Sequence, residues 1–306
     1  MPETVVEVSH LVKAYGDVKA VNAISFSVTK GEVFGMLGPN GAGKTTTVEI
    51  IEGLRSADSG LATVLGIDVS KDTRAVKEHI GVQSQNPALF PDLKTREIIN
   101  FFRSLYKKSV TTSQIIDLAS LQESQDVLFR NLSGGQQQRL SVALAFVNDP
   151  EIIFLDEPTT GLDPQARRAM WEVIETFRHN GKTVVLTTHY MEEAQRLCDR
   201  IAIMDYGRII ALDSPQRLID SNSKESAIQF KIKEYPGDQV LASLPDVSKV
   251  IKEGDDIVVY TNNIPSAISG LLGLASQLST ELSELSVRQA TLEDVFLKLT
   301  GKRIRD

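Results

Sequence analysis

The sequence of 306 residues has few of the features that indicate a secreted, membrane-embedded or disulfide-linked protein. Its one cysteine, Cys198, excludes an internal disulfide and is compatible with a reducing compartment. No apolar run approaches the roughly 18 residues that span a bilayer. Residues 1–4 show neither the cationic nor the apolar part of a secretory signal. We therefore expect a cytoplasmic protein that reaches a membrane only by docking on another protein.

The sequence also lacks an excess of positive charge. Lysine and arginine number 33 against 40 aspartates and glutamates, which gives a net charge of −7. A broad nucleic-acid-binding face needs a basic surface, so we expect no nucleic-acid partner. The hydrophobic content of 42% is sufficient for a buried core, and the length favours two domains.

Strand and helix patterns alternate as far as about residue 220. Helices are predicted at 44–53, after Pro164 and near 190–197, and strands at 5–8, 24–28, 33–37, 61–65, 152–155, 183–187 and 201–204. Such alternation predicts an α/β domain with a mainly parallel sheet. Between about 88 and 147 helical spacing replaces the strand pattern, as at Ile98, Phe101, Phe102 and Leu105. This segment is expected to be a helical subdomain.

A polar segment at 220–226 has the composition of a linker. Beyond it the patterns predict a strand (227–233), a helix (237–244), two strands (247–252 and 256–261), a helix (264–278), a strand (283–288) and a final helix (292–299). The order βαββαβ is that of a ferredoxin-like unit. We expect one domain at 1–221 and a small α+β accessory or dimerisation domain at 227–306.

A glycine-rich segment between a strand and a helix matches the P-loop pattern G-x-x-x-x-G-K-[ST]. Its residues are Gly38, Pro39, Asn40, Gly41, Ala42, Gly43, Lys44 and Thr45. Glycines let backbone N–H groups turn toward phosphates, and the helix N-terminus adds partial positive charge. Lys44 can reach the β- and γ-phosphates, the hydroxyl of Thr45 can ligate Mg²⁺, and Thr46 adds a donor. We therefore expect a P-loop NTPase.

Two adjacent carboxylates follow the buried strand pattern at 152–155. A carboxylate at the end of such a strand holds Mg²⁺ in P-loop enzymes, and Asp156 has this position. Glu157 is the natural general base for an attacking water. An ordinary strand that ends in surface acids would account for one of these carboxylates, but less easily for the turn that follows at 158–163.

A second helix N-terminus with free N–H groups follows Leu132, at Ser133, Gly134, Gly135 and Gln136. The run Asn131 to Arg139 (NLSGGQQQR) closely resembles the signature sequence of ABC-type ATPases. The resemblance covers roughly residues 3–220. It implies that two such domains stack head to tail, with each ATP between one P-loop and the signature loop of the other subunit. One P-loop and one signature loop in this chain imply a homodimer or a heterodimer with a paralogue.

The resemblance assigns roles to four further residues. Tyr15 is similar to the aromatic residue that stacks on adenine, although alone it would be read as a packed strand residue. Gln85 is similar to the glutamine that contacts Mg²⁺ and the attacking water, with Gln83 close by as an alternative. Asp163 resembles the acid of the loop after the catalytic carboxylate. His189 resembles the switch histidine that contacts the γ-phosphate.

Three kinds of ABC protein remain to be separated: a transporter subunit, a soluble factor acting on ribosomes or DNA, and an assembly ATPase. The segment between Lys44 and Asp156 has no heptad coiled coil, the chain has one cassette, and the charge is acidic, so the transporter is favoured. The alternative is a soluble ABC ATPase acting as a non-transport assembly or translation factor.

The C-terminal residues indicate which branch of ABC transporters this chain resembles. Residues 290–301 and the run 190–194 after His189 resemble the ATPases of the ABC-2 exporter branch, which includes daunorubicin-resistance-type drug-export subunits. This implies an ATP hydrolase that uses ATP and Mg²⁺, is peripheral on the inner face of the cell membrane, and energises an integral membrane permease for a drug, lipid or polysaccharide. The apolar segment 88–106 is either a groove for that permease or the core of the helical subdomain.

Overall fold

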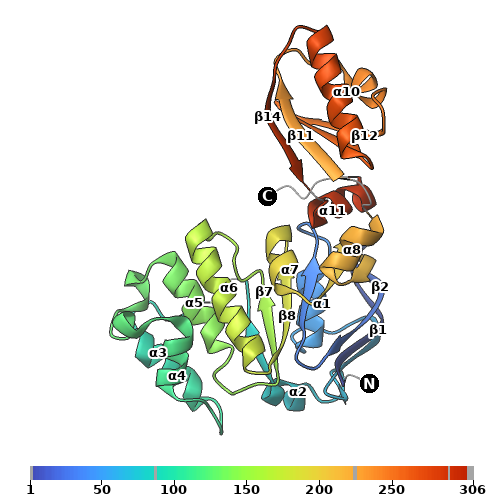
Figure 1. The fold of residues 1–306 in the computed structure, drawn as a ribbon. Coiled ribbons are helices and arrows are strands. Elements are labelled where there is room, and N and C mark those ends of the chain that lie inside the picture. The colour runs from blue at the N-terminus through green and yellow to red at the C-terminus, as the bar shows by residue number, and fades with distance from the viewer. Residues whose placement is uncertain (1–2, 86–87, 223–225, 289, 302–306) are drawn as a thin grey trace. The chain divides into compact units, whose positions relative to one another are not determined.

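The computed structural model describes residues 3–85, 88–222, 226–288 and 290–301 (Figure 1). The chain divides into two compact units, the first ending at Pro215 and the second beginning at Gln216. The linker predicted at 220–226 is wrong at its start, because the helix α8 (Pro215–Asn222) continues through residues 220–222. Residues 223–225 lie outside the described residues. In the part of the chain that the structure describes, every helix is too short or too polar to cross a bilayer.

A six-stranded sheet forms the centre of the first unit, in the order β10-β9-β3-β8-β7-β6. Neighbours from β9 to β6 run parallel, and β10 pairs antiparallel with β9. The strands are β3 (Val33–Leu37), β6 (Ile80–Gln83), β7 (Ile152–Asp156), β8 (Thr183–Thr188), β9 (Arg200–Asp205) and β10 (Arg208–Asp213). Every residue of β3, β7 and β8 is buried, as expected of parallel strands covered on both faces. The C-terminal ends of these strands carry the P-loop, Asp156 and His189.

A second sheet of the first unit is four-stranded and antiparallel, in the order β2-β1-β4-β5. Its strands are β1 (Thr4–Tyr15), β2 (Val18–Thr29), β4 (Ser59–Val64) and β5 (Ile67–Asp68). The short strands predicted at 5–8 and 24–28 are parts of two twelve-residue strands. Register shifts between the paired strands, near the left-handed residues His10 and Ala23, interrupt the alternation that marks a strand in sequence.

Helices cover the central sheet and form the insertion of the first unit. They are α1 (Lys44–Ile51), α2 (Thr73–His79), α3 (Thr95–Ser104), α4 (Thr112–Ala119), α5 (Gly134–Leu144), α6 (Pro164–His179) and α7 (Met191–Leu197). Short 3-10 turns lie at Gln122–Ser124 and Phe129–Asn131. Figure 1 shows α3 and α4 beside α5 and α6, and a separate apolar cluster containing Ile98, Ile115 and Leu140 packs the insertion internally. The predicted helical character of about 88–147 is therefore observed.

The second unit has a four-stranded antiparallel sheet in the order β12-β13-β11-β14. Its elements are β11 (Ser226–Ile232), α9 (Asp238–Ala242), β12 (Val247–Glu253), β13 (Asp256–Thr261), α10 (Ile264–Gln277), β14 (Leu282–Arg288) and α11 (Leu292–Thr300). The succession of elements from β11 to β14 is the predicted βαββαβ. The ferredoxin-like assignment and the domain limits at 221 and 227 stay our interpretation of this unit.

Candidate functional site

The P-loop connects the end of β3 to the start of α1 and is shaped by its glycines. Gly41 and Gly43 have φ of +82° and +97°, a region that side chains rarely adopt. A Cβ on Gly43 would lie 2.1 Å from the carbonyl oxygen of Ala20, and one on Gly38 would lie 2.4 Å from that of Met204. The loop therefore needs glycine at Gly41 for backbone conformation, at Gly38 for space, and at Gly43 for both.

Lys44, the first residue of α1, is 4% exposed and reaches back over the loop. Its Nζ donates hydrogen bonds to the carbonyl oxygens of Gly38 at 2.7 Å and Pro39 at 3.2 Å. Burial lowers the pKa of this ammonium, while the nearby carboxylate of Glu157 opposes that effect. The lysine thus places a positive charge inside the loop, where the phosphates of a nucleotide would meet it.

Asp156 ends β7 in the middle of the central sheet and is 6% exposed. The hydroxyl of Thr45 donates to its Oδ1 at 3.1 Å, and the hydroxyl of Thr187 donates to the same oxygen. Burial raises the pKa of this carboxyl, and the two hydroxyl donors counteract the rise. A threonine hydroxyl and a carboxylate are the hard oxygen ligands that Mg²⁺ prefers. The two residues therefore fit a magnesium ion.

No cluster of three or more His, Cys, Asp or Glu side chains forms a metal site in residues 3–85, 88–222, 226–288 and 290–301. Magnesium is commonly held by one or two carboxylates together with substrate phosphates, so the pair Thr45 and Asp156 is the kind of site that this ion uses.

Glu157 has a left-handed backbone with φ of +48°. This conformation is uncommon for a residue with a side chain, and it persists where the surroundings hold it. Here the backbone N–H donates to the hydroxyl of Thr187 at 3.0 Å. The turn directs the carboxylate of Glu157 away from the strand and toward the P-loop lysine.

Four side chains from separate segments converge on the carboxylate of Glu157. Lys44 Nζ lies 3.3 Å from Oε1. Three others surround Oε2: His189 Nδ1 at 3.2 Å, Gln85 Nε2 at 3.3 Å and Thr160 Oγ1 at 3.1 Å. His189, and then the charge of Lys44, lower the pKa of Glu157 to about 2 against the opposing effect of burial. The carboxylate is therefore ionised at neutral pH.

Of the two glutamines near residue 84, Gln85 is the one that reaches this cluster. Gln83 is 2% exposed, and its Nε2 donates to the backbone carbonyl of Ser84 at 2.6 Å. Gln85 joins Glu157, whereas no hydrogen bond links it to Thr45 or Asp156 in the described part of the chain. Its position fits contact with a water at Glu157 more directly than ligation of the metal.

The signature loop caps α5. The Ser133 hydroxyl accepts from the N–H of Gln136 at 3.3 Å, and the Gln136 side chain accepts from the N–H of Ser133 at 2.9 Å. Ser133 and Gly134 are exposed, and a Cβ on Gly134 would meet no atom within 4 Å. Among the described residues, no hydrogen bond joins this loop to Gly38–Thr45. The structure therefore does not bring the two anion-binding loops together within one chain.

Thr46 lies half-buried in the first turn of α1, whereas the predicted residues Asp163 and Tyr15 lie at exposed positions. Asp163 is the N-cap of α6 and accepts from the N–H of Ala166 at 2.8 Å. Tyr15, at the end of β1, is 43% exposed, and the cationic groups of Lys13 and Arg55 lie 5.7 and 5.3 Å from its ring centroid. An exposed ring beside two cations is suited to stacking on a base.

Two threonines for which the sequence predicts no role also contact the carboxylates of the site. Thr187 bonds both Asp156 and the backbone of Glu157, and Thr160 bonds the Glu157 carboxylate. Thr160 could have been noticed, because it follows Glu157 by three residues in a turn. Thr187 lies inside an apolar strand pattern, where a threonine carries no signal of its own.

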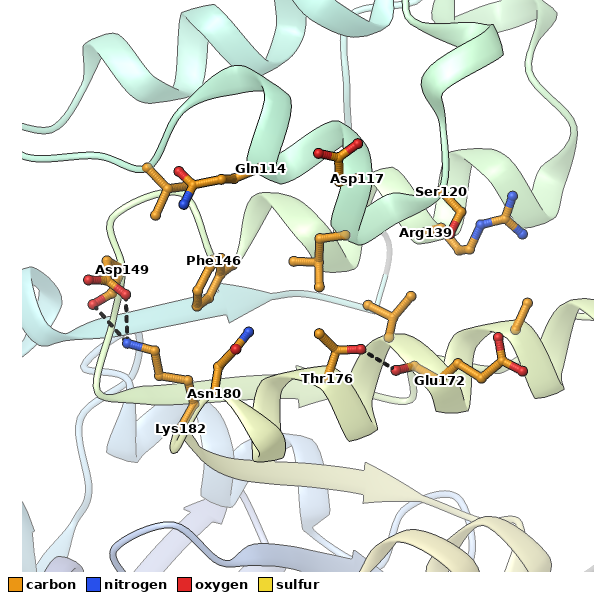
Figure 2. A pocket seen from close by; sticks show the side chains of 14 residues that line it. Gln114, Asp117, Ser120, Arg139, Phe146, Asp149, Glu172, Thr176, Asn180 and Lys182 are labelled. Atoms are coloured by element: carbon orange, nitrogen blue, oxygen red, sulfur yellow. Dashed lines mark hydrogen bonds and ion pairs between the residues drawn. The ribbon is translucent and has the colours of Figure 1, made fainter.

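A pocket of about 910 Å³ lies between the helical insertion and α6 (Figure 2). Its lining includes Arg139 of α5 and Glu172 of α6, and the ammonium of Lys182 pairs with Asp149 at 2.6 Å at one end. None of the P-loop, Asp156, Glu157 or His189 residues lines it. The chemistry described above is therefore in a different place.

Comparisons with known proteins show which family the chain belongs to. Residues 21–160 match the model of the family described as ABC transporter. The chain is 38% identical over 315 residues to "Nod factor export ATP-binding protein I" of Burkholderia lata, with 100% of both chains covered. The protein of the same name from Sinorhizobium fredii is 38% identical, covering 99% of this chain and 88% of that one.

Solved structures are similar over the first unit. A dimeric ATP-binding cassette in a post-hydrolysis state, bound to ADP and phosphate, gives a TM-score of 0.62 at 25% identity and covers 68% of this chain and 98% of that one. The ATP-binding subunit of an ABC transporter gives a TM-score of 0.63 at 24% identity over 71% of this chain and 92% of that one, which shows the fold alone. The chain belongs to the ATP-binding proteins of the ABC transporter family and is an ATP hydrolase.

Proposed function

We propose that this protein is the ATPase subunit that energises an ABC-2 type exporter, with Glu157 as the general base for ATP hydrolysis. The observation that carries the proposal is the convergence of Lys44, His189, Gln85 and Thr160 on one carboxylate. These four residues come from segments that are far apart in the sequence, and they meet beside the P-loop. The names of the full-length relatives, which are export ATP-binding proteins, support the transport role.

Glu157 accepts the proton of the attacking water, and Gln85 and Thr160 orient that water and the carboxylate. A pKa of about 2 makes Glu157 a weak base as long as Lys44 and His189 both contact it. Lys44 is also the residue that contacts the phosphates of ATP. When its ammonium turns to the phosphates, the carboxylate loses one positive neighbour and its pKa rises toward the range in which it accepts a proton.

Thr45 and Asp156 would hold the magnesium ion of MgATP. When bound, the ion neutralises charge on the phosphate oxygens. His189 contacts the γ-phosphate from the end of β8, and Tyr15 stacks on the base. The backbone N–H groups of Gly38–Thr45 surround the phosphates.

Hydrolysis takes place in a head-to-tail dimer. Among the residues that the structure describes, the exposed signature loop at Ser133 makes no hydrogen bond to its own P-loop, and as a capped helix N-terminus it suits an anion presented by another chain. A second copy, or a paralogue, supplies this loop to each ATP. The loss of the γ-phosphate then lets the two subunits separate.

The membrane partner is an integral permease, and the ATPase docks on its cytoplasmic face as a peripheral subunit. The exposed aromatic side chains Phe90, Phe101 and Tyr106 on the helical insertion offer an apolar surface for it. The transported molecule is a drug, lipid or polysaccharide. The alternative of a soluble assembly or translation factor is not favoured, because the relatives named as export proteins match the whole chain, including the second unit.

The decisive variant is Glu157→Gln, tested on the full chain with MgATP. We expect unchanged ATP affinity by calorimetry, loss of turnover, and a doubled molar mass by light scattering, because ATP would bridge two chains that cannot part. Glu151→Gln, at the opposite end of β7 with a half-exposed side chain paired to His79, is the matched control and should hydrolyse normally. Wild-type turnover by Glu157→Gln would refute the base assignment. If the variant stays monomeric with ATP, the proposal that each ATP lies between two chains is refuted.

A further inference from the structure

Unpartnered polar atoms gather behind the catalytic carboxylate. In the described part of the chain six buried side-chain atoms lack a hydrogen-bond partner. Four of the six belong to Thr159, Arg167, His189 and Glu193, which lie on the turn after Glu157, the first turns of α6, and the segment from His189 into α7. His189 Nδ1 lies 3.2 Å from the Glu157 carboxylate, and the side chains of Thr188 and Thr159 act on Glu193, so these residues form one buried polar cluster.

A stack of three side chains runs through this cluster. The guanidinium carbon of Arg167 lies 4.1 Å from the ring centroid of Tyr190, and that centroid lies 4.1 Å from the centroid of the His189 imidazole. His189 in turn faces Glu157 with Nδ1 at 3.2 Å. The Arg167 guanidinium makes no hydrogen bond or ion pair with any described residue, so Tyr190 is its one assigned polar contact in the described chain.

The imidazole of His189 needs such support because its own polar contacts are few. Its Nδ1 lies near the Glu157 carboxylate without the alignment of a hydrogen bond. The backbone beside it is fixed by the N–H of Tyr190, which donates to the hydroxyl of Thr188 at 2.9 Å. That bond fixes the chain but leaves the imidazole free to turn about its side-chain torsions, and the Tyr190 ring blocks one side.

A fully buried carboxyl underlies the stack. Glu193, on the first turn of α7, is 0% exposed, and its Oε1 accepts from the indole N–H of Trp171 of α6 at 3.1 Å. This bond joins α6, which carries Arg167, to α7, which begins directly after Tyr190. Burial raises the pKa of Glu193, and the side chains of Thr188, Thr159 and Trp171, followed by the positive charge of Arg167, oppose that rise. The charge of Arg167 therefore acts on this carboxyl, while the contact that the guanidinium makes is with the ring of Tyr190.

We infer that Arg167 is a positioning residue for ATP hydrolysis: its guanidinium, stacked on Tyr190, keeps the imidazole of His189 in place at the end of β8, from which it contacts the γ-phosphate of ATP. The inference rests on the proposed roles of His189 and Glu157. A planar cation is attracted to the face of an aromatic ring, and this attraction restricts the orientation of the Tyr190 ring. Lysine would keep the charge but lose the planar contact.

The test is a steady-state comparison of full-length variants with MgATP. We expect Arg167→Met to lower kcat about tenfold, because a small displacement of a reacting group has an effect of this size, with KM for ATP changed by less than roughly twofold. Tyr190→Leu should do the same, and Tyr190→Phe, which keeps the ring, should retain wild-type kcat. The double variant of Arg167→Met and Tyr190→Leu should be no slower than either single variant, since both remove the same stack.

Arg196→Met is the matched control. Arg196 also stacks on an aromatic ring, 4.8 Å from the centroid of Trp171, but it does not touch the segment at His189. Its variant should keep wild-type kcat, and thermal unfolding of every variant shows whether it is folded. If Arg167→Met does not fold, Arg167→Lys is measured in its place with the same expected loss of kcat.

The variant His189→Ala distinguishes a failure of the proposed role of His189 from a failure of the positioning role of Arg167. If His189→Ala keeps wild-type kcat, the proposed role of His189 is wrong and this inference falls with it. If His189→Ala is impaired while Arg167→Met and Arg167→Lys hydrolyse at the wild-type rate, the proposed function stands and only the positioning role is overturned. Multiplicative effects of Arg167→Met and Tyr190→Leu would also overturn it.

Discussion

The buried carboxyl of Glu52 makes the stability of the first unit dependent on pH. Glu52 directly follows α1, the helix that begins at the P-loop lysine, and it is 4% exposed. Burial raises its pKa from 4.5 to about 8, the negative charges of Asp156 and Glu49 add to the rise, and Lys77 opposes it. Replacing it by glutamine, which is neutral at every pH, removes this dependence.

The sign follows from the proton balance. Between pH 4.5 and about 8 the folded chain keeps the Glu52 proton and the unfolded chain does not, so unfolding releases a proton and stability falls as pH rises. The difference from 4.5 to about 8, at about 1.4 kcal/mol per pH unit, amounts to at most about 5 kcal/mol. Relaxation and water penetration reduce such penalties, so we expect Glu52→Gln to gain about 2–5 kcal/mol at about pH 9. The gain at about pH 5 should be small.

The assay is urea unfolding of the nucleotide-free chain at these two pH values, followed by tryptophan fluorescence. Trp171 is the single tryptophan of the sequence and is 2% exposed in the first unit, so its emission reports the unfolding of that unit alone. Glu78→Gln, on the exposed face of α2, is the control and should unfold as the wild type does at both values. An equal gain for Glu52→Gln at both pH values, or no gain at about pH 9, would refute the reasoning.

Two further variants test the phosphate loop by calorimetry with MgATP. Lys44→Ala should weaken ATP binding about tenfold to a hundredfold, since it removes a buried charge-assisted contact of about 1.5–3 kcal/mol; unchanged affinity would contradict the proposed cradle. Gly43→Ala should abolish binding, because its Cβ would lie 2.1 Å from the oxygen of Ala20 at a φ of +97°. Gly66→Ala, with φ of +76° but open space around its Cβ, should bind normally and lose only about 1–2 kcal/mol of stability.

The motifs that sequence could locate are those whose chemistry is local. A P-loop needs glycines and a lysine at fixed spacing, and a signature loop needs a serine at a helix N-terminus, so both are visible in one dimension. The strands β6 and β10 and the helix α2 were missed. Strand β6 is four residues long and contains Gly81, where a Cβ would lie 1.7 Å from the carbonyl oxygen of Ala145. The glycine is required by close packing in the tertiary structure, and it interrupts the apolar pattern by which a strand is predicted from sequence.

The choice between Gln83 and Gln85 also depended on the structure. They are two residues apart, a spacing that would put both side chains on the same face of a strand running through them. The strand ends at Gln83, so the chain turns and only Gln85 reaches the carboxylate of Glu157. A sequence pattern does not show where an edge strand ends to within one residue.

By itself, the sequence determined the kind of chemistry: a phosphate loop, a carboxylate pair, a second anion-binding helix end and a chain with one copy of each. These follow from residue types at short spacing. Only the tertiary structure decided which side chains share a site. Four residues that are far apart in the sequence meet at this site: Lys44, Gln85, Glu157 and His189. They meet because their strands lie in the order β3-β8-β7-β6 in one parallel sheet, with the C-terminal ends of all four strands at the same edge. The burial of that edge lowers the pKa of Lys44 and raises that of Asp156, and burial is a property of the fold and not of the sequence pattern.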